Sequence, residues 1–371
     1  MKDSILPIPT LPPELITEIL SRLPVKSLLR LKCVSKSLLA LISSPEFIKT
    51  HLCISTNNKD YANHRLLLRY KCLLKDCSLR SVLYESVMEV SHLNYPMTNQ
   101  RKTFWTVVGS VNGLICLSNE ANVLCLWNSS IRKYKKFPDF ITHLRVRVVY
   151  GFGYDEFHDD YKVVRCVYYD GSWPSVDVKI YSLKDDSWRS ICYAPPDGVR
   201  LWGSGMFVNG KLHWANNTGP VRDKGWNIIC IDLADDKWEK VEQPCCGEEE
   251  GVLVLGVLGN NLSVISKDNH LRTHIDVWVM KEYGVKESWT KMFTVKCPHS
   301  PASSVFKALF LVSNKDEILL MFGQNFLLYN LKDGSIKYPK FNKFVSGVVK
   351  AIYVESLVSP VLQHEPRTQY E

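Results

Sequence analysis

The sequence predicts a mainly β fold with a small all-α domain at the N-terminus, and a β-propeller of about six blades for the larger part. Three observations predict it: aliphatic residues at helical spacing in the first fifty positions, strand-like hairpins that recur with a period near 50 residues, and a length of 371 residues with 46% hydrophobic content. We therefore expect a helical domain at 8–52, a linker with closing strands at 53–104, the propeller at 105–360 and a tail at 361–371.

The helical domain opens with an amphipathic helix that begins at Pro12 and Pro13 and ends at Pro24. Its apolar residues recur at the i, i+3, i+4 and i+7 offsets: Leu15, Ile16, Ile19, Leu20 and Leu23. A second helix follows at once, and Ser44 is placed to cap a third. Three short helices cannot remove this much apolar surface from water alone. We expect a face that binds a partner, or one that packs on the rest of the same chain.

The order of residues in this segment resembles an F-box. The matching stretches are Leu11-Pro12-Pro13-Glu14-Leu15, Ile19-Leu20-Ser21-Arg22-Leu23-Pro24-Val25-Lys26-Ser27-Leu28, Val34-Ser35-Lys36 and Ser43-Ser44-Pro45-Glu46-Phe47. One position departs from the family: Leu38 stands where a Trp is usual, which keeps the site apolar but removes ring area.

The resemblance implies docking onto the acidic Skp-type linker subunit of cullin-based ubiquitin ligases. The residues that it assigns to the linker interface are Leu11, Pro12, Leu20, Leu23, Pro24, Leu28 and Val34. Residues 1–52 carry seven Lys or Arg against four Asp or Glu, so the charge of this segment complements an acidic partner.

Beyond residue 100 the chain repeats a pattern of two hairpins. Each unit has a pair of large apolar residues seven positions apart: Trp127 with Tyr134, Tyr181 with Trp188, Ile231 with Trp238, and Tyr329 with Ile336; in a fifth pair, Trp278 with Trp289, the turn is four residues longer. A hairpin with a polar or Gly-bearing turn precedes each pair: Asn112-Gly113, Asp159-Asp160, Asn209-Gly210, Asn260-Asn261 and Asn314-Lys315.

Two hairpins per fifty residues make one four-stranded blade, and each blade needs neighbours to cover its two apolar faces. Five units are countable. A sixth would combine strands from residues 347–357 with strands from residues 66–85, which closes the ring and removes its open edges. A sandwich of two packed sheets is the alternative, but it gives no reason for the constant spacing.

The propeller region resembles the F-box-associated domain of plant F-box proteins. The matching stretches are VNGLICL from Val111, GFGYD from Gly151, DYKVVR from Asp160, VKIYSL from Val178, FVNGKLHW from Phe207 and YVESL from Tyr353. Since no Gly-Gly pair is present, we describe the propeller as kelch-like rather than as a true kelch repeat. The resemblance implies a domain that holds the protein to be ubiquitinated.

No pattern predicts catalysis, a metal or a cofactor. Gly151-Phe152-Gly153 has Glu156 where a dinucleotide loop needs its third Gly. The acidic run Asp155, Glu156, His158, Asp159 and Asp160 lacks a calcium-loop register, and we interpret it as a solvated hairpin turn. His270 and His274 lack the intervening Glu of a helical zinc protease. We expect a non-catalytic protein without a cofactor.

The net charge of +8 keeps nucleic-acid binding open as an alternative, with Arg132-Lys133-Tyr134-Lys135-Lys136 as the candidate segment. Tyr134 already belongs to the repeat, so we expect neither a nucleic acid nor a membrane as partner. The cysteines lack a zinc pattern; Cys116, Cys125, Cys166 and Cys230 are predicted to be small buried hydrophobes. Prolines interrupt the apolar N-terminus and no bilayer-length apolar run exists, which predicts a location in the cytoplasm or nucleus.

Together these features predict the substrate-recognition subunit of an SCF-type cullin E3 ubiquitin ligase, in which a three-helix F-box precedes the kelch-like β-propeller. Its partners would be the linker subunit, through it the cullin, and a target protein. Such a chain makes and breaks no bond and acts by raising the effective concentration of its target. Trp173, Trp202 and Trp226 fall in loops between hairpins and are the candidate target-binding residues, with gap-filling between blades as the alternative. A basic propeller scaffold that binds nucleic acid or other proteins without a ligase is the alternative function.

Overall fold

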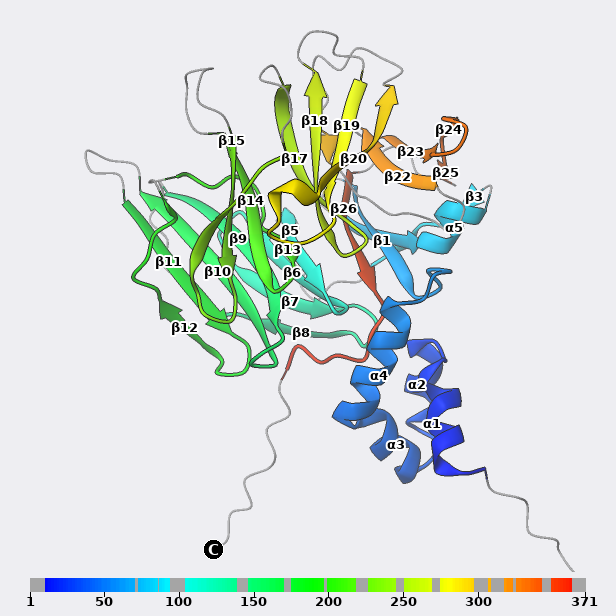
Figure 1. Ribbon diagram of the computed structural model, residues 1–371. Coiled ribbons are helices and arrows are strands. Elements are labelled where there is room, and N and C mark those ends of the chain that lie inside the picture. The colour runs from blue at the N-terminus through cyan, green and yellow to red at the C-terminus, as the bar shows by residue number, and fades with distance from the viewer. Residues whose placement is uncertain are drawn as a thin grey trace, which may run out of the picture.

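The computed structural model describes residues 11–70, 73–85, 87–93, 104–138, 146–169, 175–196, 199–217, 226–244, 250–268, 274–296, 306–307, 317–322, 325–341 and 348–361. Helices occupy the N-terminal part of these residues, and six four-stranded sheets follow. Figure 1 shows the helices α1–α4 standing together on one side of the β domain. The predicted fold class, a helical domain followed by a six-bladed propeller, is therefore confirmed.

The helical domain has four helices where the sequence predicted three. They are α1 (Pro13–Ser21), α2 (Val25–Leu31), α3 (Lys36–Ser43) and α4 (Pro45–Thr56). The predicted second helix is divided because Ser35 is extended, with φ −152° and ψ 157°, and its side chain accepts a hydrogen bond from the Leu38 backbone N–H. Ser35 thereby ends the α2 region and caps α3. Ser44 caps α4 as expected, accepting from Phe47 N–H at 3.2 Å.

The six sheets are the blades of the propeller, numbered here in chain order with the closing blade last. Their strands are β5 (Trp105–Val111), β6 (Leu114–Asn119), β7 (Leu124–Asn128) and β8 (Lys133–Lys136) in blade 1; β9 (Val146–Asp155), β10 (Asp160–Tyr169), β11 (Ser175–Ser182) and β12 (Ser187–Ser190) in blade 2; β13 (Met206–Val208), β14 (Lys211–Asn217), β15 (Trp226–Asp232) and β16 (Trp238–Val241) in blade 3; β17 (Glu250–Leu258), β18 (Asn261–Asp268), β19 (His274–Met280) and β20 (Trp289–Lys296) in blade 4; and β21 (Phe306–Lys307), β22 (Glu317–Phe322), β23 (Asn325–Asn330) and β24 (Ile336–Lys337) in blade 5.

Blade 6 joins the two ends of the propeller sequence. It pairs β26 (Val348–Val354) with β1 (His64–Tyr70), followed by β2 (Leu73–Ser78) and β4 (Ser91–His92). The short helix α5 (Leu79–Tyr84) lies between β2 and β4, and a parallel pair joins β3 (Val87–Met88) to β25 (Lys340–Phe341). The antiparallel β26–β1 pairing confirms the predicted closure of the ring by residues from both ends.

The apolar pairs found seven positions apart are cross-strand neighbours in the outer hairpins. Trp127 lies opposite Tyr134, Tyr181 opposite Trp188, Ile231 opposite Trp238, and Tyr329 opposite Ile336. Five positions after the first member of each pair comes a residue with positive φ: Arg132, Asp186, Asp236 and Gly334. The same left-handed turn therefore closes each of these hairpins.

The fifth pair is displaced. Trp278 lies opposite Lys291, and Trp289 lies opposite Met280, because the ladder shifts register next to Trp278. The longer turn contains a 3₁₀ helix, Lys286–Ser288.

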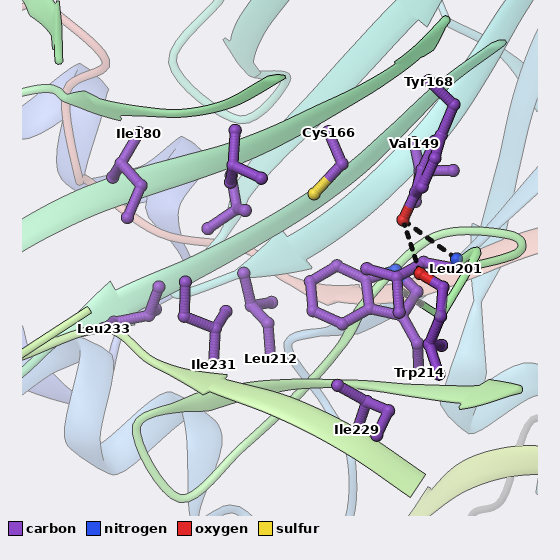
Figure 2. Close-up of a cluster of buried hydrophobic side chains, with 13 residues drawn as sticks. Val149, Cys166, Tyr168, Ile180, Leu201, Leu212, Trp214, Ile229, Ile231 and Leu233 are labelled. Carbon is purple, nitrogen blue, oxygen red and sulfur yellow. Dashed lines mark hydrogen bonds between the residues drawn. The ribbon is translucent and has the colours of Figure 1, made fainter. Parts of the chain in front are cut away.

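Six clusters of buried side chains fill the spaces between neighbouring blades, one cluster for each interface around the ring. Figure 2 shows the cluster between blades 2 and 3, where Ile180 and Cys166 face Ile231, Leu212 and Trp214. A side chain on Gly151 would come within 2.8 Å of Leu212 in this cluster. The Gly-Phe-Gly stretch is thus required for close packing of strands, which explains it without a nucleotide.

Candidate functional site

The structure divides the seven predicted linker-binding residues into two groups. Leu11, Pro12, Pro24 and Val34 are exposed and Leu23 is half-buried, whereas Leu20 and Leu28 are buried. Leu28 exposes none of its surface, because it packs at the centre of the four helices with Ile42 and Phe47. The prediction that Leu20 and Leu28 offer surface to a partner is therefore wrong: they build the core that holds the exposed residues in place.

Three exposed aliphatic residues were missed by the resemblance. Leu15, Ile19 and Leu39 each expose about half of their surface, and Leu15 and Ile19 are one turn apart on α1. Together with Leu11 and Val34, which is 69% exposed, we call them the exposed F-box aliphatics. The i, i+4 spacing of Leu15 and Ile19 was the signal available in the sequence, since it places both residues on one stripe of α1.

A second side of the helical domain is covered by the propeller. Leu357, which follows β26, is buried against the F-box core, and Ile131 from the outer turn of blade 1 packs on the same cluster. Burial, and then the neighbouring Lys133 of β8, lowers the pKa of Lys32 at the end of α2. The propeller therefore shields the side formed by α2 and α4 and leaves the exposed F-box aliphatics uncovered.

A buried histidine holds the helices together on the covered side. His51 of α4 is fully buried, and its Nε2 lies 2.9 Å from the carbonyl oxygen of Leu23. Because a carbonyl only accepts, Nε2 carries the proton and donates. Burial lowers the pKa of His51 below its usual value, which keeps the ring neutral. The chain turn after α1 is thereby fixed to α4.

The propeller presents two different faces. Since neighbouring strands are antiparallel, the turns after the first and third strands of each blade lie at one end, and the other connections lie at the opposite end. Three residues of the first set make contacts below the ring: Asp159 pairs with Lys49, Ile131 packs on the F-box core, and the Asn112 carbonyl oxygen accepts a hydrogen bond from Ser356. We call this end the turn face and the other end the loop face. The F-box therefore sits on the turn face (Figure 1).

Chain order places Trp202 at the loop face. Trp202 lies in the connection between β12 and β13, is 62% exposed, and carries the Arg147 guanidinium 3.4 Å above its ring. The same guanidinium lies 5.4 Å from the Tyr168 ring. Trp202 is thus a large exposed ring held in a fixed position by a cation–π contact.

The other two tryptophans differ from Trp202. Trp226 begins β15 and is partly buried against the cluster between blades 3 and 4, which matches the alternative of filling a gap. Trp173 lies outside the described residues. The exposed Tyr193, in the same connection as Trp202, was not singled out from the sequence.

The acidic turn of blade 2 is occupied by protein groups. Asp155 is buried and accepts from Lys162 Nζ at 2.7 Å and from the backbone N–H groups of Phe157 and His158. Asp160, also buried, accepts from Lys184 N–H at 2.8 Å. The expected solvated turn is wrong for these two carboxylates, because each satisfies turn amides and is removed from water.

No three His, Cys, Asp or Glu side chains in the described part of the chain gather in a way that would hold a metal ion. His274 begins β19, and His270 lies outside the described residues. Cys116, Cys125, Cys166 and Cys230 are buried, as predicted, and burial raises the pKa of the Cys125 thiol to about 12. None of the described helices is long and apolar enough to cross a bilayer.

The basic segment of blade 1 forms an edge strand. Lys133–Lys136 is β8, the outermost strand, and Tyr134 faces Trp127 across the ladder. Lys135 pairs with Asp186 of blade 2 at 2.7 Å. Charged side chains on an outer strand discourage pairing with another sheet, so this segment has a structural explanation.

Two family models match the chain. Residues 8–50 match the F-box domain and residues 66–360 match the F-box associated β-propeller domain. An F-box/kelch-repeat protein of Arabidopsis thaliana is 34% identical over 363 residues, covering 94% of this chain and 96% of that protein. The F-box protein CPR1 of Arabidopsis thaliana is 32% identical over 377 residues, covering 94% of this chain and 89% of that protein.

These matches span both structural parts, the four helices and the ring. F-box domains typically bind the Skp-type linker within SCF complexes, and adaptors of this family are generally non-catalytic. The chain belongs to the plant F-box proteins that carry a C-terminal F-box-associated β-propeller.

Proposed function

We propose that this protein is the substrate-recognition subunit of an SCF-type cullin E3 ubiquitin ligase. The observation that carries the proposal is the set of exposed F-box aliphatics on helices whose other side is already covered. Aliphatic side chains left in water next to a filled core are typical of a surface that a partner completes. Lys36, an exposed cation, begins α3, the helix that carries Leu39, and suits an acidic linker subunit.

The target would bind at the loop face, with Trp202 as an anchor. An exposed tryptophan whose orientation is fixed loses little conformational freedom on binding, which favours it as an interface residue. The loop face lies at the opposite end of the blades from the F-box. A target held there is kept clear of the linker, and the ligase acts by tethering it near a charged ubiquitin-conjugating enzyme. Both partners are proteins of the cytoplasm or nucleus in this proposal.

Ile19→Asp tests the linker interface. Ile19 is chosen because it is exposed on α1, whereas Leu23 packs partly on the core. Burying an unpaired carboxylate in the interface should weaken co-purification with a Skp-type linker at least about thirtyfold, or about 2 kcal/mol. The matched control is Leu73→Asp, the same type of change at an exposed leucine of the propeller. Equal recovery of linker with both variants would refute the interface.

Proximity labelling under proteasome inhibition tests the target side. Proteins labelled equally by the wild type and by Ile19→Asp, but not by Trp202→Ala, would be targets that the loop face holds. In cells without the inhibitor, those of them that accumulate with Ile19→Asp but not with the wild type would be the ones that the ligase degrades. Labelling that is independent of Trp202 would remove this residue from the target surface.

A further inference from the structure

Residues 355–361, which follow β26, cross the turn face and contact both parts of the molecule. We call them the C-terminal strap. One end of the strap reaches the F-box through Leu357, which is 4% exposed and packs with Leu20 and Leu28. A residue more than three hundred positions from α1 is thus part of the F-box core.

The propeller holds the strap through a fully buried asparagine. Asn128, at the end of β7 in blade 1, places its Nδ2 3.0 Å from the carbonyl oxygen of Ser356 and 2.8 Å from that of Val358. Its Oδ1 accepts from Ser130 N–H at 2.9 Å. The Ser356 hydroxyl donates to the Asn112 carbonyl oxygen at 2.9 Å. Because buried hydrogen bonds hold the residues on both sides of Leu357, this part of the strap is fixed in a single position.

Asn128 lies at a position that recurs in the blades, directly after the first member of the apolar pair, and it makes contacts that the equivalent residue of blade 5 does not. The equivalent residue of blade 5, Asn330, also accepts a turn amide, from Lys332 at 2.8 Å. In Asn128 the amide nitrogen in addition donates to the strap. The turn uses only the oxygen of Asn128, whereas the two hydrogen bonds to the strap need its amide nitrogen, which an Asp would lack.

Further contacts join the F-box to the closing blade and to blade 2. Asn63 donates from Nδ2 to the Ser55 hydroxyl of α4 at 3.0 Å, and its carbonyl oxygen accepts from Glu355 N–H at 2.8 Å. Lys49 pairs with Asp159 at 2.6 Å, but both side chains are exposed and such a pair adds little. The F-box is therefore fixed at separate points rather than through a single chain crossing.

We propose that the C-terminal strap is a positioning element, in which Asn128 and Leu357 hold the F-box in one orientation on the turn face. The linker-docking helices and the loop face then move as one rigid body. A target would be presented at a set distance and direction from the ligase core, which raises the effective concentration of only those lysines that face the conjugating enzyme. This purpose rests on the proposed function, but the rigid coupling does not.

The test is a distance distribution between two spin labels in the full chain. The labels are placed at Glu46→Cys on α4 and Asp185→Cys in the outer turn of blade 2, both of which are exposed. The other reactive cysteines are first replaced by Ser. The wild type should give one narrow distance. Asn128→Asp keeps the bond from Ser130 but sets a carboxylate against two carbonyl oxygens, and should at least double the width. Asn330→Asp, the matched control, should leave it unchanged.

Circular dichroism and a thermal melt confirm that each variant is folded. If Asn128→Asp does not fold, Leu357→Ala takes its place, and a doubled or an unchanged width of the distance distribution has the same meaning. An unchanged width in a folded variant would overturn the proposal. Titration of the wild type with a Skp-type linker separates this result from the proposed function. If the wild type does not bind the linker but Asn128→Asp doubles the width of the distance distribution, the ligase role alone is refuted. If the wild type binds the linker but the width is unchanged in Asn128→Asp, the role of the strap alone is refuted.

Discussion

Two buried histidines respond strongly to their surroundings in the folded protein. Burial lowers the pKa of His64 in β1 and of His213 in β14 to about 4 in each case. His213 donates from Nδ1 to the Met206 carbonyl oxygen at 3.2 Å and accepts at Nε2 from the Tyr283 hydroxyl at 2.6 Å. Burial disfavours the charged imidazolium, so the His213 ring is neutral at neutral pH.

His213 should make the fold sensitive to acid. Its pKa is lower in the folded than in the unfolded chain, so its contribution to stability is complete above about pH 6.5 and is lost as the pH falls towards 4. The loss is up to about 3 kcal/mol. We expect His213→Gln to be less stable than the wild type at neutral pH and to lose less between pH 7 and pH 4 in denaturant titrations. Parallel pH profiles for the two proteins would contradict this role.

The sequence singled out three tryptophans as candidate target-binding residues but could not tell which of them would be exposed. Trp202 and Trp226 stand in similar Gly- or Asn-bearing surroundings in the sequence, yet one is exposed and the other partly buried. Trp202 lies under Arg147 of β9, whereas Trp226 packs on the cluster between blades 3 and 4. Contacts of this kind join positions far apart in the chain and leave no local pattern.

At the scale of the elements, two hairpin turns differ in how strictly they require a glycine. Gly113 and Gly210 both have positive φ in Asn-Gly turns of the inner hairpins. A Cβ on Gly113 would collide with the Ser356 hydroxyl and lie 2.7 Å from the Val354 carbonyl oxygen, whereas a Cβ on Gly210 would meet nothing within 4 Å. The first turn therefore combines two requirements, a left-handed backbone and room for the strap.

Gly113→Ala should destabilise the propeller more than Gly210→Ala. The left-handed backbone alone costs about 1 kcal/mol in both variants. The collision with Ser356 adds to this cost at Gly113, and we expect a total of about 2 to 4 kcal/mol there. Chemical denaturation of the two variants side by side measures the difference. Equal losses would show that the strap does not pass as closely over blade 1 as the structure has it.

The elements that depend on local order were predicted from the sequence. Cross-strand pairs such as Trp127 with Tyr134 follow from the length of a short turn, so their spacing shows in the chain. The displaced register at Trp278 could not be predicted, because a longer turn allows more than one pairing. The break before α3 was missed since the aliphatic pattern continues through Ser35, and only its extended backbone reveals the cap.

At the scale of the whole molecule, the propeller closes on itself and on the F-box with the same segment. β26 completes blade 6, and the strap that follows it adds Leu357 to the helical core. The predicted closure of the ring was confirmed because the period left strands for a sixth blade. Packing of the helices on the rest of the chain was one of the two expectations, but the part played by Leu357 was not foreseen, because a single leucine near the C-terminus carries no periodic signal. Its consequence is that one side of the F-box is filled by the chain itself while the exposed F-box aliphatics remain open.

Calorimetric titration of a purified Skp-type linker into the full-length protein tests the central claim most directly. The account predicts saturable one-to-one binding, with a negative change in heat capacity because apolar surface is buried. Ile19→Asp should weaken this binding at least about thirtyfold, and Leu73→Asp should leave it within about twofold of the wild type. No binding by the wild type, or equal affinity for the wild type and Ile19→Asp, would contradict the claim that these helices recruit a ligase.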